Sequence, residues 1–338
     1  MQEESTLKRI ALIIPYFGNF KNYFPLFLVS CKNNPSVDWI VFTDDRAEYP
    51  YPQNVKVIYT TFEKIEERIQ KHFDFHVLLD KPYKLCDYRP AYGEIFSNEL
   101  RGYDFWGYCD IDLIFGNIRK FLDEEILEKF SKIFTRGHFS LYKNEPDINS
   151  FYRNVDDSFL RKVFTSERPF NFDEWGGISR YWSISKQPYY DELCMDDIRS
   201  GFTSFRTTKE MNGYGGPYNE MNKDLSAIYK KMQNIVYSYE NGALYRCFII
   251  NGKFKKEEVM YAHFQKRNLS VDKDILEELI SDEKWLIVPN YFTKWLQLDK
   301  NEVKKIAPKK FCINDLKLEI KLILFKIYRN MKRGDLRR

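Results

Sequence analysis

The chain has 338 residues and a formal net charge of +4, and aromatic residues make up 17% of it. This length allows one large domain or two small ones with a sizeable core, and the aromatic content argues against disorder. The charge is unevenly distributed, because residues 303–338 hold twelve Lys and Arg against three Asp and Glu, a balance of +9 that leaves −5 for the rest. This argues against a general nucleic-acid binder, and no nucleic-acid partner is expected.

Cysteine usage and hydropathy restrict the compartment. The six cysteines are scattered without a CxxC pair, which argues against a zinc site and fits reduced thiols in a reducing compartment. The apolar run at residues 10–15 is too short for the hydrophobic region of a signal peptide, and no stretch has the length of an uncharged transmembrane helix. We therefore expect a cytoplasmic protein.

Strands and helices alternate near the start of the chain. Residues 9–15 and 38–43 are continuous apolar runs, typical of parallel strands buried on both faces, and residues 55–59 indicate a third strand. Residues 61–71 predict an amphipathic helix capped by Thr61. The alternation predicts an α/β protein with a Rossmann-like, mixed but mostly parallel central sheet flanked by helices.

Polar and aromatic residues follow the first two strands. Pro15, Tyr16 and Phe17 come directly after the first strand, and Asp44 follows the second. Ligands of open α/β sheets gather at the carboxyl ends of strands, so these residues are candidates for one binding site. An ordinary strand-to-loop aspartate is the alternative interpretation of Asp44.

The most informative stretch is a short buried strand at residues 103–108 that leads to Asp110 and Asp112. Alternate residues of an extended chain share a face, so both carboxylates can point the same way. Two like charges so close raise each other's pKa unless they share a cation. Oxygen ligands suit Mg²⁺ or Mn²⁺, which keep positions open for substrate phosphates. A turn with capping aspartates is the alternative.

Charged residues also precede this strand. Lys84, Asp87 and Arg89 lie in what we interpret as a loop that enters a helix at residues 94–100. Their charges could meet a diphosphate or the hydroxyl groups of a sugar. The start of a surface helix would carry the same residues, so both interpretations stay open.

Two adjacent carboxylates stand among aromatic residues after a predicted helix at residues 119–134 and a predicted strand at residues 136–142. Asp173 and Glu174 could supply a general base in a partly dry pocket. The alternative is a capped helix start, with Asp173 as the cap and Trp175 in the core.

A histidine and two cations end a late apolar strand. Residues 242–251 and 254–258 suggest antiparallel strands, and the strand that follows them ends in His263, Lys266 and Arg267. The histidine could complete a metal shell, and the cations could bind phosphate oxygens. A strand-end histidine without a ligand is the alternative.

The end of the chain predicts a basic amphipathic helix. Such a helix could lie on an anionic bilayer, at the inner face of the plasma membrane, or could pack on its own domain with a basic solvent face. Its apolar residues at helical spacing are Ile313, Leu316, Ile320, Ile323, Leu324, Ile327 and Met331.

Several segments, taken together and in this order, resemble a bacterial family of GT-A-type glycosyltransferases. The family occurs in capsule, exopolysaccharide and lipopolysaccharide gene sets, and its members are often described only as a domain of unknown function. The resemblance covers about residues 9–268 and leaves out the tail. The segments are IPYFGNF at residues 14–20, FTDD at 42–45, KLCDYRPAYGEIF at 84–96, FWGYCDIDLIFGNI at 105–118, FDEW at 172–175 and YAHFQKR at 261–267.

The resemblance implies a GT-A-like fold and a hexosyltransferase-type activity. A sugar would move from a nucleotide-sugar donor, most simply a UDP-sugar, to a glycan or lipid-linked acceptor, with Mn²⁺ or Mg²⁺ bridging protein and diphosphate. The domain would span residues 1–300, with a nucleotide-binding half at about 1–120 and an acceptor half at about 121–300. Residues 301–338 would form the tail.

The same resemblance implies a role for each candidate residue. Asp110 and Asp112 would bind the metal with His263. The nucleotide base would lie against Pro15, Tyr16 and Asp44, and the donor sugar against Asp87. The diphosphate would face Lys266 and Arg267. In an inverting enzyme Asp173 or Glu174 would deprotonate the acceptor hydroxyl, whereas in a retaining enzyme they would position the acceptor.

Two other classes of function compete with this one. A nucleotidyltransferase or phosphotransferase could use the same aspartate pair, but it would normally have a Gly-Ser or phosphate-loop element before the carboxylates, and the sequence shows none. A non-catalytic glycan-binding protein could have the same fold.

Overall fold

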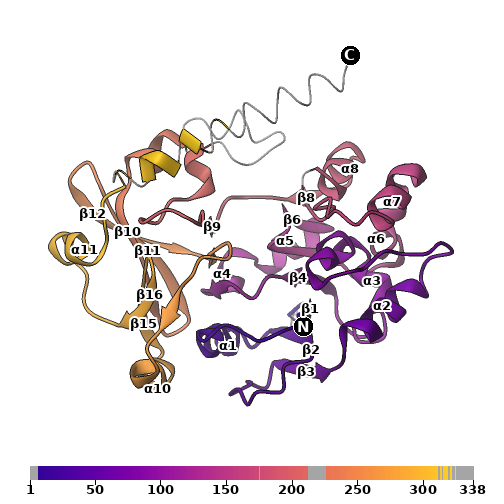
Figure 1. Ribbon diagram of the computed structural model, residues 1–338, viewed down its shortest axis with the longest axis horizontal. Helices are drawn as coiled ribbons and strands as arrows, with labels where there is room; N and C mark the ends of the chain where they lie inside the picture. The colour runs from indigo at the N-terminus through magenta and orange to yellow at the C-terminus, as the bar shows by residue number, and fades with distance from the viewer. Residues whose placement is uncertain are drawn as a thin grey trace, which may run out of the picture. The chain divides into compact units, whose positions relative to one another are not determined.

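The chain divides into two compact units, Met1–Cys194 (unit 1) and Met195–Arg338 (unit 2). The structure is a computed structural model (Figure 1). The expected division into a domain at residues 1–300, whose two functional halves meet near residue 120, and a tail at residues 301–338 stays a prediction. The structure describes residues 7–174, 176–211, 226–310, 313, 315–318, 320–321 and 324.

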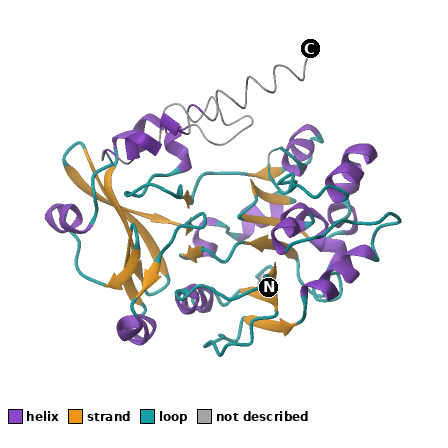
Figure 2. Ribbon diagram, in the orientation of Figure 1, coloured by secondary structure: helices purple, strands orange, loops and turns teal. Residues whose placement is uncertain are grey.

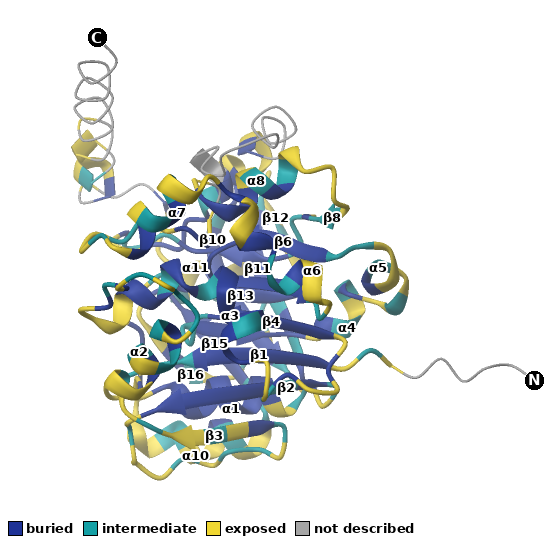
Figure 3. Ribbon diagram, turned by 90° about the vertical axis from the view of Figure 1, so that its right-hand side faces the viewer, coloured by how far each residue is buried: buried dark blue, intermediate teal, exposed yellow. Residues whose placement is uncertain are grey.

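A seven-stranded mixed sheet forms the centre of unit 1, in the order β3-β2-β1-β4-β7-β6-β8. Strands β3, β2, β1 and β4 run parallel, whereas β7 is antiparallel to both β4 and β6. The central strands are buried (Figure 3), which explains their continuous apolar sequences and confirms the predicted sheet. The bounds are β1 Ile10–Pro15, β2 Val37–Thr43, β3 Val55–Tyr59, β4 Phe105–Cys109, β6 Lys132–Arg136, β7 Phe139–Lys143 and β8 Tyr189–Tyr190, with β5 at Leu113–Phe115.

Mostly short helices flank this sheet (Figure 2). Helix α2 begins after Thr61, whose side chain accepts a hydrogen bond from the Lys64 N–H as predicted. The helices are α1 Phe24–Lys32, α2 Phe62–Gln70, α3 Tyr92–Ile95, α4 Ile118–Phe121, α5 Glu124–Lys129, α6 Pro146–Asn149, α7 Asp157–Phe164 and α8 Ile178–Ile184, with 3₁₀ helices η1 Pro82–Asp87, η2 Arg89–Ala91 and η3 Phe151–Asn154.

Two predicted helices of unit 1 are wrong. The prediction of one helix over residues 119–134 fails because Asp123 caps a new helix, α5, by accepting a hydrogen bond from the Ile126 N–H at 2.9 Å. Residue Phe130 is extended, and β6 follows it. The helix predicted at residues 94–100 occurs earlier, as η1, η2 and α3, since Pro82 and Pro90 favour the first turn of a helix.

Aromatic side chains pack the interior of unit 1. Trp106 of β4 stacks on Tyr142 of β7 with ring centroids 4.6 Å apart, and Trp182 of α8 meets the same tyrosine edge-on at 5.9 Å. The two strands approach closely at Gly107, where an added Cβ atom would lie 2.1 Å from the Ser140 carbonyl oxygen. Only glycine therefore fits this position of β4.

Unit 2 is built on a six-stranded sheet in the order β12-β11-β10-β15-β16-β14. The predicted antiparallel pair near residues 242–258 is confirmed as β11 and β12. The described residues of unit 2 form strands β9 Asp196–Asp197, β10 Gln233–Glu240, β11 Ala243–Ile250, β12 Lys253–Val259, β13 Tyr261–His263, β14 Ser270–Val271, β15 Lys284–Val288 and β16 Tyr291–Lys294, and helices η4 Thr208–Met211, α10 Lys273–Asp282 and α11 Lys300–Ile306.

Most of the predicted tail helix lies outside the described residues. Among those described, Asp315 is buried and accepts hydrogen bonds from the Thr203 N–H and hydroxyl at 2.7 and 3.0 Å. Four apolar positions of the tail are exposed, namely Ile313, Leu316, Ile320 and Leu324. None of the helices in the described part of the chain is long and apolar enough to cross a lipid bilayer.

The close approach at Gly107 predicts a marked loss of stability in Gly107→Ala. The methyl group would push against the Ser140 carbonyl, and overpacking of this kind costs about 1–3 kcal/mol of unfolding free energy. Urea denaturation, monitored by circular dichroism, measures this loss of unfolding free energy. Gly176→Ala is the control, because a Cβ atom there meets nothing within 4 Å. Equal urea midpoints for Gly107→Ala and wild type would show that β4 and β7 do not approach as closely as described.

Candidate functional site

The carboxyl ends of β1, β2 and β4 carry most of the predicted site residues of unit 1. Asp110 directly follows β4, and its N–H donates to the His138 carbonyl at 3.0 Å. Its carboxylate is 30% exposed, so a ligand can reach it. Asp112, two residues later, is half-buried.

Two aspartates after β2 hold the loop that follows β1. Asp44 accepts a hydrogen bond from the Gly18 N–H at 2.8 Å, where Gly18 has a φ of +94°. Asp45 accepts one from the Phe20 N–H at 3.0 Å. Although burial opposes ionisation of Asp45, hydrogen bonds from backbone N–H groups lower the pKa of its carboxyl. The Asp44 carboxylate is therefore a loop anchor on an exposed residue, and its contact with a nucleotide base stays a prediction.

The negative charge of Asp112 acts on the loop after β1. Burial raises the pKa of the Tyr16 hydroxyl, and the negative charges of Asp112 and Asp45 raise it further. The Tyr16 ring stacks on Phe20 with centroids 4.8 Å apart, and Tyr16 follows Pro15 at the end of β1. These strand ends thus form one region, as we expected for the ends of parallel strands.

Phe17 is placed differently from its neighbours in this loop. Its ring contacts Phe62 of α2 edge-on at 5.4 Å and packs against the hydrophobic core. A packing role therefore explains Phe17, and its place in the binding site stays a prediction.

Arg89 bridges the strand-end carboxylate to a second, buried one. One of its terminal nitrogens donates to Asp110, and the other donates to Asp173 at 2.9 Å and to the Gly137 carbonyl at 2.6 Å. The guanidinium group also lies 5.3 Å from the centre of the Tyr108 ring. A planar, permanently charged group with several donors suits such a bridge.

Asp173 is the strongest candidate for a proton acceptor. It is 2% exposed, and this burial raises the pKa of its carboxyl to about 7 although Arg89 opposes the rise; Glu174 and Asp110 add to it. A carboxyl with a pKa near neutrality can take up a proton and release it again at physiological pH. Glu174, its neighbour, is exposed.

The alternative that Asp173 caps a helix is wrong. Helix α8 begins at Ile178, and its N-cap is Gly177, which makes no side-chain cap. Asp173 instead lies in a turn, and its backbone carbonyl oxygen accepts a hydrogen bond from the Tyr108 hydroxyl at 3.4 Å. Trp175, the other part of that interpretation, lies outside the described residues.

Lys84 and Asp87 do not reach the surface, contrary to the interpretation that they meet a ligand directly. Both are fully buried, and they form an ion pair at 2.6 Å. Lys84 also donates to the Val163 carbonyl at 2.7 Å, and Asp87 accepts hydrogen bonds from the N–H groups of Phe170 and Phe172. The pair therefore holds the segment that leads to Asp173.

Arg267 is likewise occupied inside unit 2. It is 5% exposed, and its guanidinium donates to backbone carbonyls, including that of Phe202 at 2.6 Å and that of Pro289. Burial lowers the pKa of this guanidinium to about 10. Its predicted contact with a diphosphate does not fit this arrangement, whereas Lys266 is exposed and remains a candidate.

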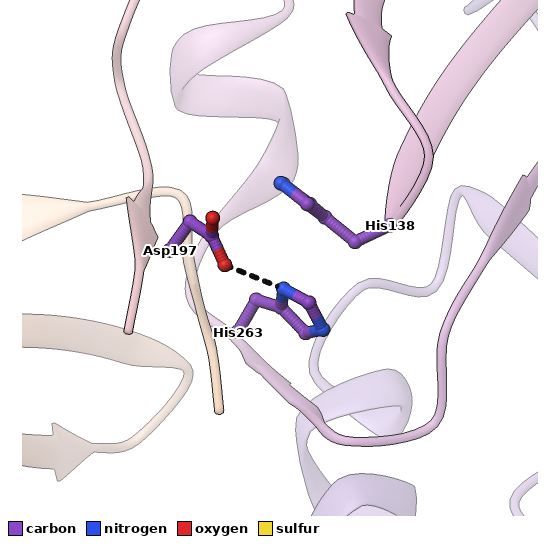
Figure 4. Close-up of side chains that lie close together, drawn as sticks. All are labelled: His138, Asp197 and His263. Carbon is purple, nitrogen blue, oxygen red and sulfur yellow. Dashed lines mark hydrogen bonds and ion pairs between the residues drawn. The ribbon is translucent and has the colours of Figure 1, made fainter. Parts of the chain in front are cut away.

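His263 ends β13 beside a carboxylate that the sequence did not single out. Its Nδ1 atom lies 2.8 Å from Asp197 Oδ1 (Figure 4), and the Gln265 amide donates to both Asp197 oxygens at 2.7 Å. Asp197 belongs to β9, a two-residue strand that we did not predict from the sequence. The adjacent acidic pair Asp196-Asp197 was the available signal, and nothing local shows that it pairs with His263.

The buried Asp173 predicts a pH-dependent contribution to stability. Because its pKa is raised on folding, the folded state holds the proton more tightly, and wild type should lose stability relative to Asp173→Asn as the pH rises from about 4 to about 7. The slope is at most about 1.4 kcal/mol per pH unit, and no further change is expected above pH 7.

Thermal denaturation of both proteins across this range measures the difference. Glu128→Gln is the control, because Glu128 of α5 is exposed and is not among the charges that raise the pKa of Asp173, so this variant reports the general effect of losing a surface carboxylate. A flat difference for Asp173→Asn would show that Asp173 titrates normally.

Solved structures similar to this chain include glycosyltransferases. Galactosyltransferase LgtC in complex with donor and acceptor sugar analogues is 10% identical with a TM-score of 0.38, and the match covers 76% of this chain and 88% of that chain. Mouse xyloside xylosyltransferase 1, in its apo form, is 10% identical with a TM-score of 0.39, covering 77% and 98%. GlyE of Streptococcus pneumoniae TIGR4 is 12% identical with a TM-score of 0.27, covering 56% and 46%.

No curated protein matches the sequence. One family does match it, over residues 12–295, which include the strand-end carboxylates of unit 1 and the His263 segment of unit 2. The match ends before the basic tail. The chain belongs to this family, DUF6625, which is a family of unknown function.

Proposed function

We propose that this protein is a metal-dependent glycosyltransferase that moves a sugar from a nucleotide-sugar donor to a glycan or lipid-linked acceptor in bacterial surface polysaccharide biosynthesis. The observation that carries the proposal is the connection of the partly exposed Asp110 through Arg89 to the buried Asp173. Two carboxylates in such different surroundings suit two different tasks. Asp110 would hold an ion, and Asp173 would handle a proton.

The donor set fits a hard divalent ion. Asp110 and Asp112 offer carboxylate oxygens, and His263 would add an imidazole nitrogen, a combination that suits Mn²⁺ or Mg²⁺. When bound, the ion would neutralise charge on the diphosphate leaving group. Asp112 is half-buried, and burial also raises the pKa of the nearby Tyr16 hydroxyl, which supports a site from which water is partly excluded.

The nucleotide sugar, with a UDP-sugar as the first candidate, would bind along the strand ends of unit 1. The Tyr16 ring and the Gly18 backbone, fixed by Asp44, offer an ordered surface for a base. The exposed Lys266 would bind phosphate oxygens. Lys84, Asp87 and Arg267 would act indirectly, by holding the backbone that carries the site.

The acceptor hydroxyl would lose its proton to Asp173 or Glu174 if the reaction inverts configuration. Asp173 has the pKa suited to this transfer, and Arg89 fixes the orientation of its carboxylate at 2.9 Å. Glu174 is exposed and could hydrogen-bond an acceptor sugar. In a retaining reaction both residues would position the acceptor.

We also propose that the tail lies on an anionic membrane surface. Ile313, Leu316, Ile320 and Leu324 are 74%, 53%, 50% and 60% exposed, and their spacing places them along one face of a helix. This exposure favours a membrane over packing of these residues on unit 2. Lys and Arg interleaved in the sequence would each add on the order of 1 kcal/mol near anionic lipid.

Asp110→Asn and Asp112→Asn should each lower sugar transfer by about 10²-fold or more, because the diphosphate charge loses its stabilisation. Release of UDP, GDP or CMP from the corresponding nucleotide sugars, with and without Mn²⁺, measures the activity. Asp123→Asn is a matched control, since asparagine also caps α5.

Wild-type activity in Asp110→Asn would refute the metal-dependent mechanism. Release of pyrophosphate from a nucleoside triphosphate and a sugar phosphate would indicate a nucleotidyltransferase. Tight donor binding without turnover, across a panel of acceptors, would indicate a glycan-binding protein.

Replacing Leu316, Ile320 and Leu324 together by serine should abolish sedimentation with vesicles that contain anionic lipid, while Asp315 keeps its contact with Thr203. Ile184→Ser is the control, because Ile184 is 68% exposed but lies outside the tail. Equal sedimentation of the triple variant and wild type would exclude the tail as the anchor.

A further inference from the structure

His263 and Asp197 occupy paired positions of two short parallel strands. In the register of β9 and β13, Asp197 is the partner of His263, and Asp196 is the partner of Ala262. The Ile198 N–H donates to the His263 carbonyl at 2.8 Å, which fixes this alignment. Both residues are buried, Asp197 at 5% and His263 at 7% exposure, so their contact occurs largely out of water.

The contact determines which ring nitrogen of His263 carries a proton. An ionised carboxylate only accepts hydrogen bonds, so an ionised Asp197, 2.8 Å from Nδ1, would accept the hydrogen bond from an Nδ1–H group. In neutral imidazole the lone pair then resides on Nε2. The Gln265 amide donates to both Asp197 oxygens, which suits a carboxylate that serves as an acceptor.

Asp197 is held in place by its neighbour. The side chain of Asp196 is fully buried and accepts hydrogen bonds from Arg246 at 2.7 and 2.8 Å and from the Tyr237 hydroxyl at 2.8 Å. Lys209 lies 3.3 Å from the same carboxylate. This ion-pair network anchors β9, so Asp197 is presented from a rigid backbone rather than from a loose loop.

We propose that Asp197 is a positioning residue that keeps His263 in the Nδ1–H form, with Nε2 available to a divalent cation. This inference rests on the proposed function, in which His263 is a metal ligand. A carboxylate behind a metal-binding histidine orients the ring and makes the ligand nitrogen more basic. Gln265 is part of the same arrangement, because it orients the carboxylate.

The first test reads the tautomer in the metal-free protein. With ¹⁵N-labelled histidine, two-bond correlation spectra distinguish the Nδ1–H from the Nε2–H form, and His263→Gln identifies the signal among the four histidines. We expect the Nδ1–H form in wild type. In Asp197→Ala the more common Nε2–H form should replace it. An Nε2–H pattern in wild type would overturn the proposal without any variant.

The second test measures binding of Mn²⁺ alone by electron paramagnetic resonance. Asp197→Asn and Asp197→Ala should weaken binding about 10- to 100-fold, as removal of such outer partners usually does. Gln265→Leu should weaken it less. Asp282→Asn, an exposed carboxylate at the end of α10, should leave it unchanged.

Unchanged Mn²⁺ affinity in folded Asp197→Ala would overturn the proposal. The proposed function fails separately: if the tautomer and the Mn²⁺ affinities follow expectation but no nucleotide sugar is turned over or bound, the positioning role stands and glycosyl transfer does not.

Discussion

The bridge that Arg89 makes between Asp110 and Asp173 is the interaction on which the candidate site of unit 1 depends. It joins the end of β4 to the turn before α8, two segments far apart in the sequence. Its permanently charged guanidinium allows one carboxylate to stay partly exposed while the other is buried. Without it, Asp173 would lose the nearest charge that opposes its raised pKa.

Other buried charges hold the backbone around the candidate residues. The pair Lys84–Asp87 holds the chain before Asp173, and the Asp196–Arg246 pair fixes β9 beside His263. Breaking one partner of such a pair typically costs about 3–5 kcal/mol, because the other charge stays buried. Arg267 also holds the backbone in place, but it does so by donating hydrogen bonds to backbone carbonyl groups.

The sequence predicted β1, β2 and β4 well, for a physical reason. Strands buried on both faces must be continuously apolar, so β1 and β2 stand out, and the aspartates after β4 stand out against the apolar strand before them. The prediction of one long helix over residues 119–134 failed because it missed the cap at Asp123, which starts the separate helix α5.

The partners of charged residues were much harder to predict. Lys84, Asp87 and Arg267 have the residue types of a phosphate or sugar site, yet tertiary packing pairs them inside the protein. Asp197 lies far from His263 in sequence, and only the pairing of β9 with β13 brings them together. Local sequence carries no record of such a pairing.

The central claim is that the aspartates after β4 bind a divalent cation that in turn binds the phosphates of a sugar donor. Anomalous diffraction from crystals of the full chain grown with Mn²⁺ and UDP tests it most directly. The account predicts one manganese peak bound by Asp110 or Asp112, together with His263 and the diphosphate. A diphosphate bound elsewhere, or a manganese ion held without either aspartate, would contradict it.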